Sequence, residues 1–212
     1  MMWIAFYNPK AAGDVLLLTR EATRSEHLPV VESKENVTCI KNEETNKINS
    51  VNIFNISSSL PLHETGVVTL SNEDQKTIND IIQQAGFDVE VSLDETPKFV
   101  VGYVEEIEPV EGSDHLNKTQ TRVGADEVLQ IVCGASNIDQ GQSVIVAKPG
   151  AVMPNGMIIW PGELRGVESH GMVCSTRELN LTHIENEDGI WVLPDGYEPG
   201  TSLEDVVSDL SK

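Results

Sequence analysis

The sequence of 212 residues predicts a mainly β protein with two domains, an α+β N-terminal domain over residues 1–95 and a five-stranded barrel over residues 98–205. Apolar segments of strand length recur along the chain, separated by turn-forming residues. One long segment with helical periodicity lies in the first half. The polar segment Asp94-Glu95-Thr96-Pro97 ends in a proline, which is typical of a boundary between domains.

The first domain is expected to contain an antiparallel sheet. Two short apolar segments, 3–7 and 15–19, predict a hairpin with a longer loop. Segments 35–40 and 48–56 alternate apolar and polar residues, which indicates strands with one buried face.

One helix is expected after these strands. Residues 71–74, Ser-Asn-Glu-Asp, resemble a capping box at a helix start. The apolar residues that follow at the i, i+3, i+4 and i+7 positions of one helix face are Ile78, Ile81, Ile82 and Ala85. Gly86 is expected to end the helix, because glycine adopts the left-handed conformation freely. Residues 87–93 then predict a last strand.

The second domain contains five strand candidates, at 99–107, 117–123, 128–133, 143–147 and 190–193. Five strands are the number of an OB-fold barrel. Gly102 inside the first candidate and Gly134 just after the third fit the sharp coiling that a small barrel requires. Residues 202–210 predict a short terminal helix with an acidic outer face.

The chain is strongly acidic, with 34 acidic and 14 basic residues and a formal net charge of −20. Residues 1–97 hold seven basic and fifteen acidic residues, and residues 98–212 hold seven and nineteen, so neither half is basic. A nucleic acid is normally bound by Lys and Arg that replace its counterions. Any nucleic-acid site is therefore expected to be local and weak.

The three cysteines, Cys39, Cys133 and Cys174, lie far apart and form no CxxC pair, which favours a reducing compartment over a disulfide framework. The N-terminus lacks the features of a signal peptide, and no apolar segment approaches the ~20 residues of a membrane span. We therefore expect a soluble cytoplasmic protein. Neither a cofactor nor a metal is predicted, since buried cysteines explain Cys133 and Cys174 better than zinc ligation with His170 does.

Three linked motifs lie in the second half: Cys-Gly-Ala-Ser-Asn at 133–137, Lys-Pro-Gly-Ala-Val-Met-Pro at 148–154, and Leu-Arg-Gly-Val-Glu-Ser-His-Gly-Met-Val-Cys-Ser at 164–175. Their order and spacing resemble the OB-fold tRNA-binding domain of the bacterial phenylalanyl-tRNA synthetase beta subunit. The same domain occurs in EMAP-II-like proteins and in stand-alone YtpR-type proteins. The resemblance covers about residues 98–203 and implies an OB fold that binds tRNA. At 114–116 the family shows Asp-Lys-Leu, and here His115 replaces the permanent cation.

The resemblance implies that Asn137, Ser169 and Met172 face the RNA. An amide and a hydroxyl can hydrogen-bond an RNA group, and a thioether packs on a sugar or base without requiring a sequence. A structural use is open for each side chain. Asn137 could close its own turn, and Met172 could fill the barrel.

Four cations are candidate phosphate contacts. Lys118 and Arg122 share one face of the second strand, because strand residues two apart point the same way. Lys148 stands beside Pro149-Gly150 in a loop context, and Arg165 stands beside the Glu-Ser-His-Gly-Met element. A solvated strand face is the equally simple alternative for Lys118 and Arg122.

The predicted function is a non-catalytic protein that binds folded tRNA through shape and backbone contacts. Few aromatic residues are available for base stacking, so DNA is not an expected partner. No Gly-rich phosphate loop, HExxH or GxSxG motif indicates an enzyme. Two alternatives stay open. One is an OB-fold module that binds another protein, or a second copy of itself, and has lost RNA affinity; the other is an enzyme in the N-terminal half.

Overall fold

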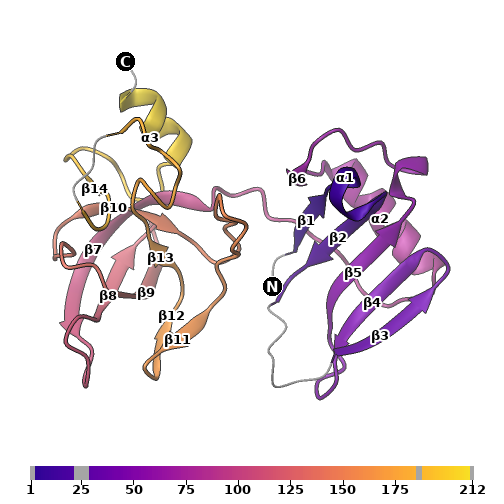
Figure 1. Ribbon diagram of the computed structural model, residues 1–212, viewed down its shortest axis with the longest axis horizontal. Helices are drawn as coiled ribbons and strands as arrows, with labels where there is room; N and C mark the ends of the chain where they lie inside the picture. Colours follow the sequence, from indigo (N-terminus) through magenta and orange to yellow (C-terminus); the bar gives the residue numbers. More distant parts are fainter. Residues whose placement is uncertain (1–2, 22–28, 185–187, 211–212) are drawn as a thin grey trace. The chain divides into compact units, whose positions relative to one another are not determined.

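The computed structural model describes residues 3–21, 29–184 and 188–210. It divides into two compact units, Met1–Glu95 and Thr96–Lys212, and both consist mainly of β-strands (Figure 1). Each unit has hydrophobic clusters of its own, one in the first unit and two in the second. Of the helices in the described ranges, none is long and apolar enough to span a membrane.

The first unit is built on a six-stranded antiparallel sheet with the order β3-β4-β5-β2-β1-β6. The strands are β1 Ile4–Tyr7, β2 Val15–Thr19, β3 Pro29–Lys34, β4 Val37–Asn42, β5 Ile48–Phe54 and β6 Gly66–Val67. Two short helices, α1 (Pro9–Ala12) and the 3-10 helix η1 (Ile56–Ser58), lie in the connections. Strand β3 was not predicted, because its residues are exposed or half-buried and show no apolar alternation.

Helix α2 (Asn72–Gln84) begins at the capping box that the sequence predicts, with Ser71 and Asp74 bonded to each other's backbone. Its residues Ile78 and Ile82 are fully buried in the core of the sheet. Gly86 follows with a φ of 78°. The helix therefore covers the apolar face of the sheet.

The predicted strand at 87–93 does not form, and the segment makes only an isolated parallel bridge between Leu93 and Trp3. Two side chains of α2 bond to several of its backbone groups. Asn79 accepts from the Val91 amide at 2.7 Å and donates to the Val91 carbonyl at 2.9 Å, and Gln75 accepts from the Leu93 amide at 3.0 Å. Since side chains satisfy these backbone groups, the segment needs no partner strand.

The second unit contains a five-stranded sheet with the order β13-β10-β7-β8-β9. Its strands are β7 Phe99–Pro109, β8 Asn117–Arg122, β9 Val128–Cys133, β10 Ser143–Ala147 and β13 Met172–Val173. The two-residue strand β14 (Val192–Leu193) also pairs with β10, and β11 (Gly162–Leu164) and β12 (Val167–Ser169) form a separate hairpin. Helix α3 (Leu203–Leu210) follows, with Val206 buried.

The sequence predicts β7 to β10 closely, but the segment expected at 190–193 is a strand only at β14, and β11 to β13 were not predicted. The last three are two or three residues long, which is too short for a period of two to be recognised.

The sheet of the second unit curls until its two edges meet. Strands β12 and β13 lie against β9, and the His170 amide donates to the Gln130 carbonyl at 2.8 Å. Gly102 lies inside the curl. A Cβ at this position would come within 2.6 Å of Val146 Cγ2 and 2.8 Å of Thr121 Cγ2, so the interior has no room for a side chain there.

Candidate nucleic-acid interface

Three of the four predicted cations are neutralised by a carboxylate. The nitrogen–oxygen distances are 2.8 Å for Lys118 and Glu108, 2.7 Å for Arg122 and Glu105, and 2.5 Å for Lys148 and Glu127. The hydrogen bond from Lys118 lowers the pKa of the Glu108 carboxyl. The Lys118 and Arg122 pairs have partly exposed side chains, and pairs of this kind are individually weak. The Lys148 side chain is only 14% exposed, so its pair with Glu127 is better shielded from solvent. A phosphate can therefore compete with each carboxylate for its cation. Binding of the phosphate requires that the carboxylate first leave the cation.

Strand register creates two of these contacts. Lys118 on β8 stands directly opposite Glu108 on β7, and Arg122 stands opposite Tyr103. The Arg122 guanidinium carbon lies 5.5 Å from the centre of the Tyr103 ring, as in a cation–π contact. Lys118 and Arg122 thus share a strand face as predicted, and each is held in place by a neighbour on β7.

The fourth predicted cation, Arg165, is exposed in the turn between β11 and β12. Arg165 and Gly166 have φ values of 53° and 77°, the left-handed pair of a tight hairpin turn. Within the described ranges Arg165 forms no ion pair. Its charge is therefore available to an anion.

Asn137 uses its whole amide inside the protein. It donates to the Ile190 carbonyl and accepts from the Ile190 amide, both at 3.0 Å. The side chain thus ties the loop after β9 to a segment 53 residues later. A Cβ on Gly189 would lie 2.1 Å from Asn137 Oδ1, so position 189 requires glycine.

Ser169 is also used internally. Its side chain is only 5% exposed, and its hydroxyl accepts from the Val132 amide at 3.1 Å and donates to the Gly171 carbonyl at 3.3 Å. The hydroxyl therefore helps to hold β12 against β9, in addition to the His170–Gln130 bond.

Replacing Ser169 with alanine is expected to lower the free energy of unfolding of the second unit by about 2 kcal/mol, because the buried Val132 amide loses its acceptor. Urea unfolding of the whole chain, followed by the backbone NMR signals of the second unit, measures this. Ser208→Ala is the matched control, since Ser208 is exposed on α3. An unchanged unfolding curve for Ser169→Ala would show that the Val132 amide has another acceptor.

Met172 is half-buried, and it lines a shallow pocket of about 280 Å³. Its walls are formed by residues 132–135, strand β13, residues 189–190, Ser175 and Glu178. Arg177, which was not predicted, also lines this pocket, is exposed and forms no ion pair in the described part of the chain. The neighbouring Glu178 carboxylate accepts instead from the Ser175 amide at 2.8 Å and from its hydroxyl at 2.7 Å.

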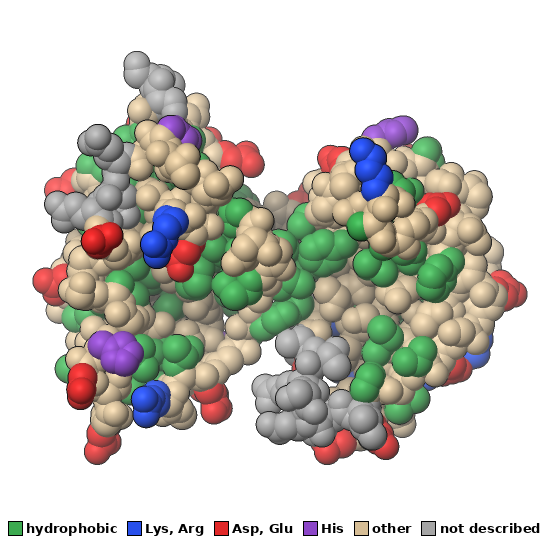
Figure 2. All heavy atoms as spheres, viewed as in Figure 1, with side chains coloured by type: hydrophobic (Ala, Val, Ile, Leu, Met, Phe, Trp, Pro, Cys, Tyr) green, Lys and Arg blue, Asp and Glu red, His purple; other side chains and the backbone are tan. Residues whose placement is uncertain are grey.

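One feature of the sequence could have indicated Arg177. The residue lies two positions after Ser175, where the last of the three motifs ends. The face of the molecule drawn in Figure 2 shows Lys and Arg side chains singly, with more numerous Asp and Glu among them. No broad basic surface appears on that face.

Both cysteines of the second unit are buried, and Cys133 lines this pocket. Burial raises the pKa of both thiols, that of Cys174 to about 12, so both are neutral near pH 7. His170 lies 3.5 Å from Glu168. Within the described ranges, no three His, Cys, Asp or Glu side chains converge on a possible metal position.

Comparisons with known proteins place the chain in a family. The family described as "Putative tRNA binding domain" matches residues 99–202, and a "Domain of unknown function (DUF4479)" matches residues 26–94. The "Putative tRNA-binding protein YtpR" of Bacillus subtilis is 46% identical over 200 residues, which are 94% of this chain and 98% of that protein.

Two further matches cover about half of this chain. The phenylalanine–tRNA ligase beta subunit of Oceanobacillus iheyensis is 50% identical over 123 residues, 55% of this chain but only 15% of that subunit. The C-terminal domain of Plasmodium vivax p43 is 27% identical over 48% of this chain and 56% of that chain, with a TM-score of 0.35. The match to YtpR extends over nearly the whole of both proteins, and the chain therefore belongs to the YtpR family.

Proposed function

We propose that this chain binds folded tRNA, without catalysing a reaction, through an OB fold formed by its second unit. The observation that carries the proposal is the match of a tRNA-binding family to residues 99–202, the range that contains the whole curled sheet. The meeting of β9 with β12 and β13 supports the barrel, since closure of the sheet is what distinguishes a barrel from an open sheet.

The proposed contact surface begins at two arginines of the second unit that form no ion pair with any carboxylate in the described part of the chain. These are Arg165 in the β11–β12 turn and Arg177 at the pocket lined by Met172. An arginine can bind a phosphate through two parallel hydrogen bonds, and the thioether of Met172 can pack on a sugar or a base. Lys118, Arg122 and Lys148 join the surface once a phosphate displaces their carboxylates.

Asn137 and Ser169 have a supporting role in this proposal. Their polar groups are bonded to Ile190, Val132 and Gly171. They hold the walls of the Met172 pocket in place and contribute to RNA affinity through that geometry.

All three cysteines are buried. Burial raises the pKa of all three cysteines, that of Cys39 to about 11, so thiolate chemistry is suppressed at neutral pH. We place the protein in the cytoplasm, where its partner tRNA is present. Few aromatic residues are available as stacking platforms, and folded RNA is thus preferred to single-stranded DNA.

A salt-dependent titration tests the proposal. The logarithm of tRNA affinity is expected to fall with the logarithm of salt concentration at a slope of roughly −2 to −4, which corresponds to about three or four phosphate contacts. Arg177→Ala should make the slope shallower by about one unit, because one phosphate contact is lost. Lys10→Ala, which removes an exposed charge from the first unit, is the matched control.

No binding of tRNA at low ionic strength would contradict the proposal. It would favour the alternative of an interaction module, for which the neutralised cations Lys118, Arg122 and Lys148 would have a purely structural use.

A further inference from the structure

The first unit contains a pocket of about 300 Å³ where cations gather. Its charged lining residues are Arg20, Lys34, Lys41, Lys47, Glu32 and Asp88, which give a formal charge of +2. Residues 1–97 as a whole hold seven basic and fifteen acidic residues. The pocket therefore reverses the sign of charge that prevails in its own unit.

Sheet register places two lysines on one face. Glu32 stands opposite Cys39, and the alternation of β-strands puts Lys34 and Lys41 on the same side as this pair. The Glu32 carboxylate bonds to Lys41 and lies 2.8 Å from Lys34, and these hydrogen bonds lower its pKa to about 2. One carboxylate thus holds two ammonium groups together and leaves one positive charge in excess.

Lys34 is fixed by the segment after helix α2. Its ammonium lies 4.5 Å from the centre of the Phe87 ring and donates to the Gly86 carbonyl at 3.2 Å. The wall formed by residues 86–89 therefore carries a positioned cation beside an aromatic ring.

Arg20 is held on a rigid support. Its Nε donates to the Ile48 carbonyl at 2.7 Å, and its guanidinium carbon lies 4.8 Å from the centre of the Trp3 ring. Trp3 is itself buried, and its indole donates to the Glu90 carbonyl at 2.9 Å. Among the described residues the two terminal nitrogens of Arg20 donate no hydrogen bond. They are the groups that bind a phosphate in a fork.

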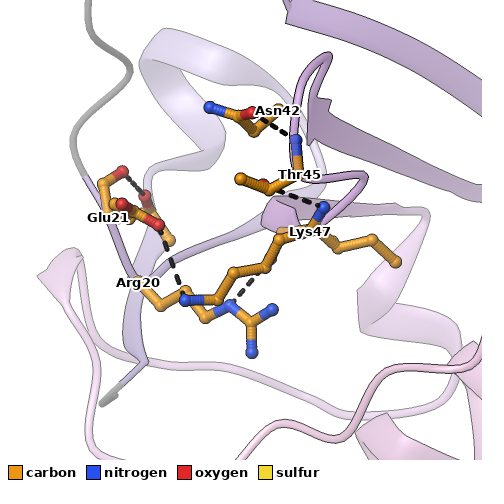
Figure 3. Close-up of polar contacts among 7 residues, drawn as sticks. Arg20, Glu21, Asn42, Thr45 and Lys47 are labelled. Carbon is orange, nitrogen blue, oxygen red and sulfur yellow. Dashed lines mark hydrogen bonds and ion pairs between the residues drawn. The ribbon is translucent and has the colours of Figure 1, made fainter.

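Lys47 is positioned by the turn between β4 and β5. Asn42 Oδ1 accepts from the Glu44 amide at 3.0 Å and the Thr45 amide at 2.9 Å, which fixes the turn. Figure 3 shows the Lys47 side chain extending from this turn toward Arg20 and Glu21. The Lys47 ammonium lies 3.7 Å from a carboxylate oxygen of Glu21.

We propose that this pocket binds the phosphate group of a phosphorylated ligand, with Arg20 and Lys47 as its principal contacts. The guanidinium supplies a planar fork, and the adjacent ammonium adds a point charge. Ile48, Phe87 and Val89 in the lining offer apolar surface to the organic part of the ligand. The phosphate can belong to a free small molecule or to an RNA backbone. The site lies in the first unit, and it does not require the tRNA surface proposed for the second unit.

Titration of the isotope-labelled full chain with pyrophosphate and with adenosine monophosphate tests the site. Saturable NMR shifts are expected in the amides of residues 47, 48 and 86–89. Lys47→Gln and Arg20→Gln should each weaken binding by about tenfold, the effect of losing one charge-assisted hydrogen bond. Lys10→Gln, a charge change at an exposed position of the same unit, should leave it unchanged.

The source of the phosphate follows from a parallel tRNA titration. If Lys47→Gln weakens tRNA and pyrophosphate alike, the ligand is an RNA backbone; if it weakens only the small phosphates, the ligand is a small molecule. Shifts absent at millimolar pyrophosphate, or equal in Lys47→Gln and the parent, would overturn the site. Lys47 lies at the end of an exposed turn, so its variant keeps the test valid even if Arg20→Gln is unstable. A chain that binds pyrophosphate but no tRNA would contradict only the function proposed for the second unit.

Discussion

Replacing Glu105, Glu108 and Glu127 together with glutamine is expected to strengthen tRNA binding about tenfold or more. Each carboxylate now neutralises a cation of the proposed surface, with nitrogen–oxygen distances of 2.5 to 2.8 Å. Once it is removed, a phosphate meets a free Lys or Arg and no longer competes with an internal partner. The salt slope should also become steeper by about 2 to 3 units, because up to three more counterions are released. Fluorescence titrations of tRNA at several salt concentrations measure both quantities.

The matched control is the triple change of Glu106, Glu111 and Glu198 to glutamine. It alters the net charge equally, but these side chains form no ion pair within the described ranges. Any gain from reduced overall repulsion therefore appears in both variants. Equal gains would mean that Lys118, Arg122 and Lys148 do not contact the RNA.

Gly189→Ala is expected to destabilise the second unit by about 3 kcal/mol or more. The new Cβ would lie 2.1 Å from Asn137 Oδ1, and the residue has a φ of 109°, which alanine adopts with strain. Asn137 cannot yield without breaking its two hydrogen bonds to Ile190. Urea unfolding followed by the NMR signals of Ile190 and Trp191 measures the loss.

Gly196→Ala separates steric overlap from backbone strain. Gly196 has a φ of 114°, but nothing lies within 4 Å of its would-be Cβ. Its replacement should cost about 1 to 2 kcal/mol, the strain alone. If the two variants lose the same stability, the contact between Gly189 and Asn137 adds nothing and the loop adapts.

Local sequence signals predict elements whose causes are local. The capping box at Ser71 and Asp74 lies within four residues and gives helix α2 its correct start. The contacts that decide the site are not local. Asn137 finds its partner Ile190 far along the chain, and Lys118 meets Glu108 only through a register that shifts at a bulge between Val104 and Glu106.

The cation pocket of the first unit could not be predicted from the sequence for the same reason. Arg20, Lys34, Lys41 and Lys47 come from β2, β3, β4, β5 and the residues flanking them, so only the sheet order brings them together. No spacing along the chain indicates the cluster. The charge of a strand residue can be read from the sequence. Its neighbours depend on how strands pair, and each pairing joins residues that are far apart in the sequence.

The contact between β9 and residues 168–170, here called the seam, also bears on the kinetics of folding. Its bonds join residues 37 to 40 positions apart, so they can form only after a long loop of chain has closed. The seam should therefore be a late step in folding and an early place of local opening. Met172 and the end of β9 lie at this seam and also line the pocket beside Arg177. Brief opening of the seam would take the pocket apart, so the measured affinity for a ligand there would be scaled by the fraction of time that the seam is closed.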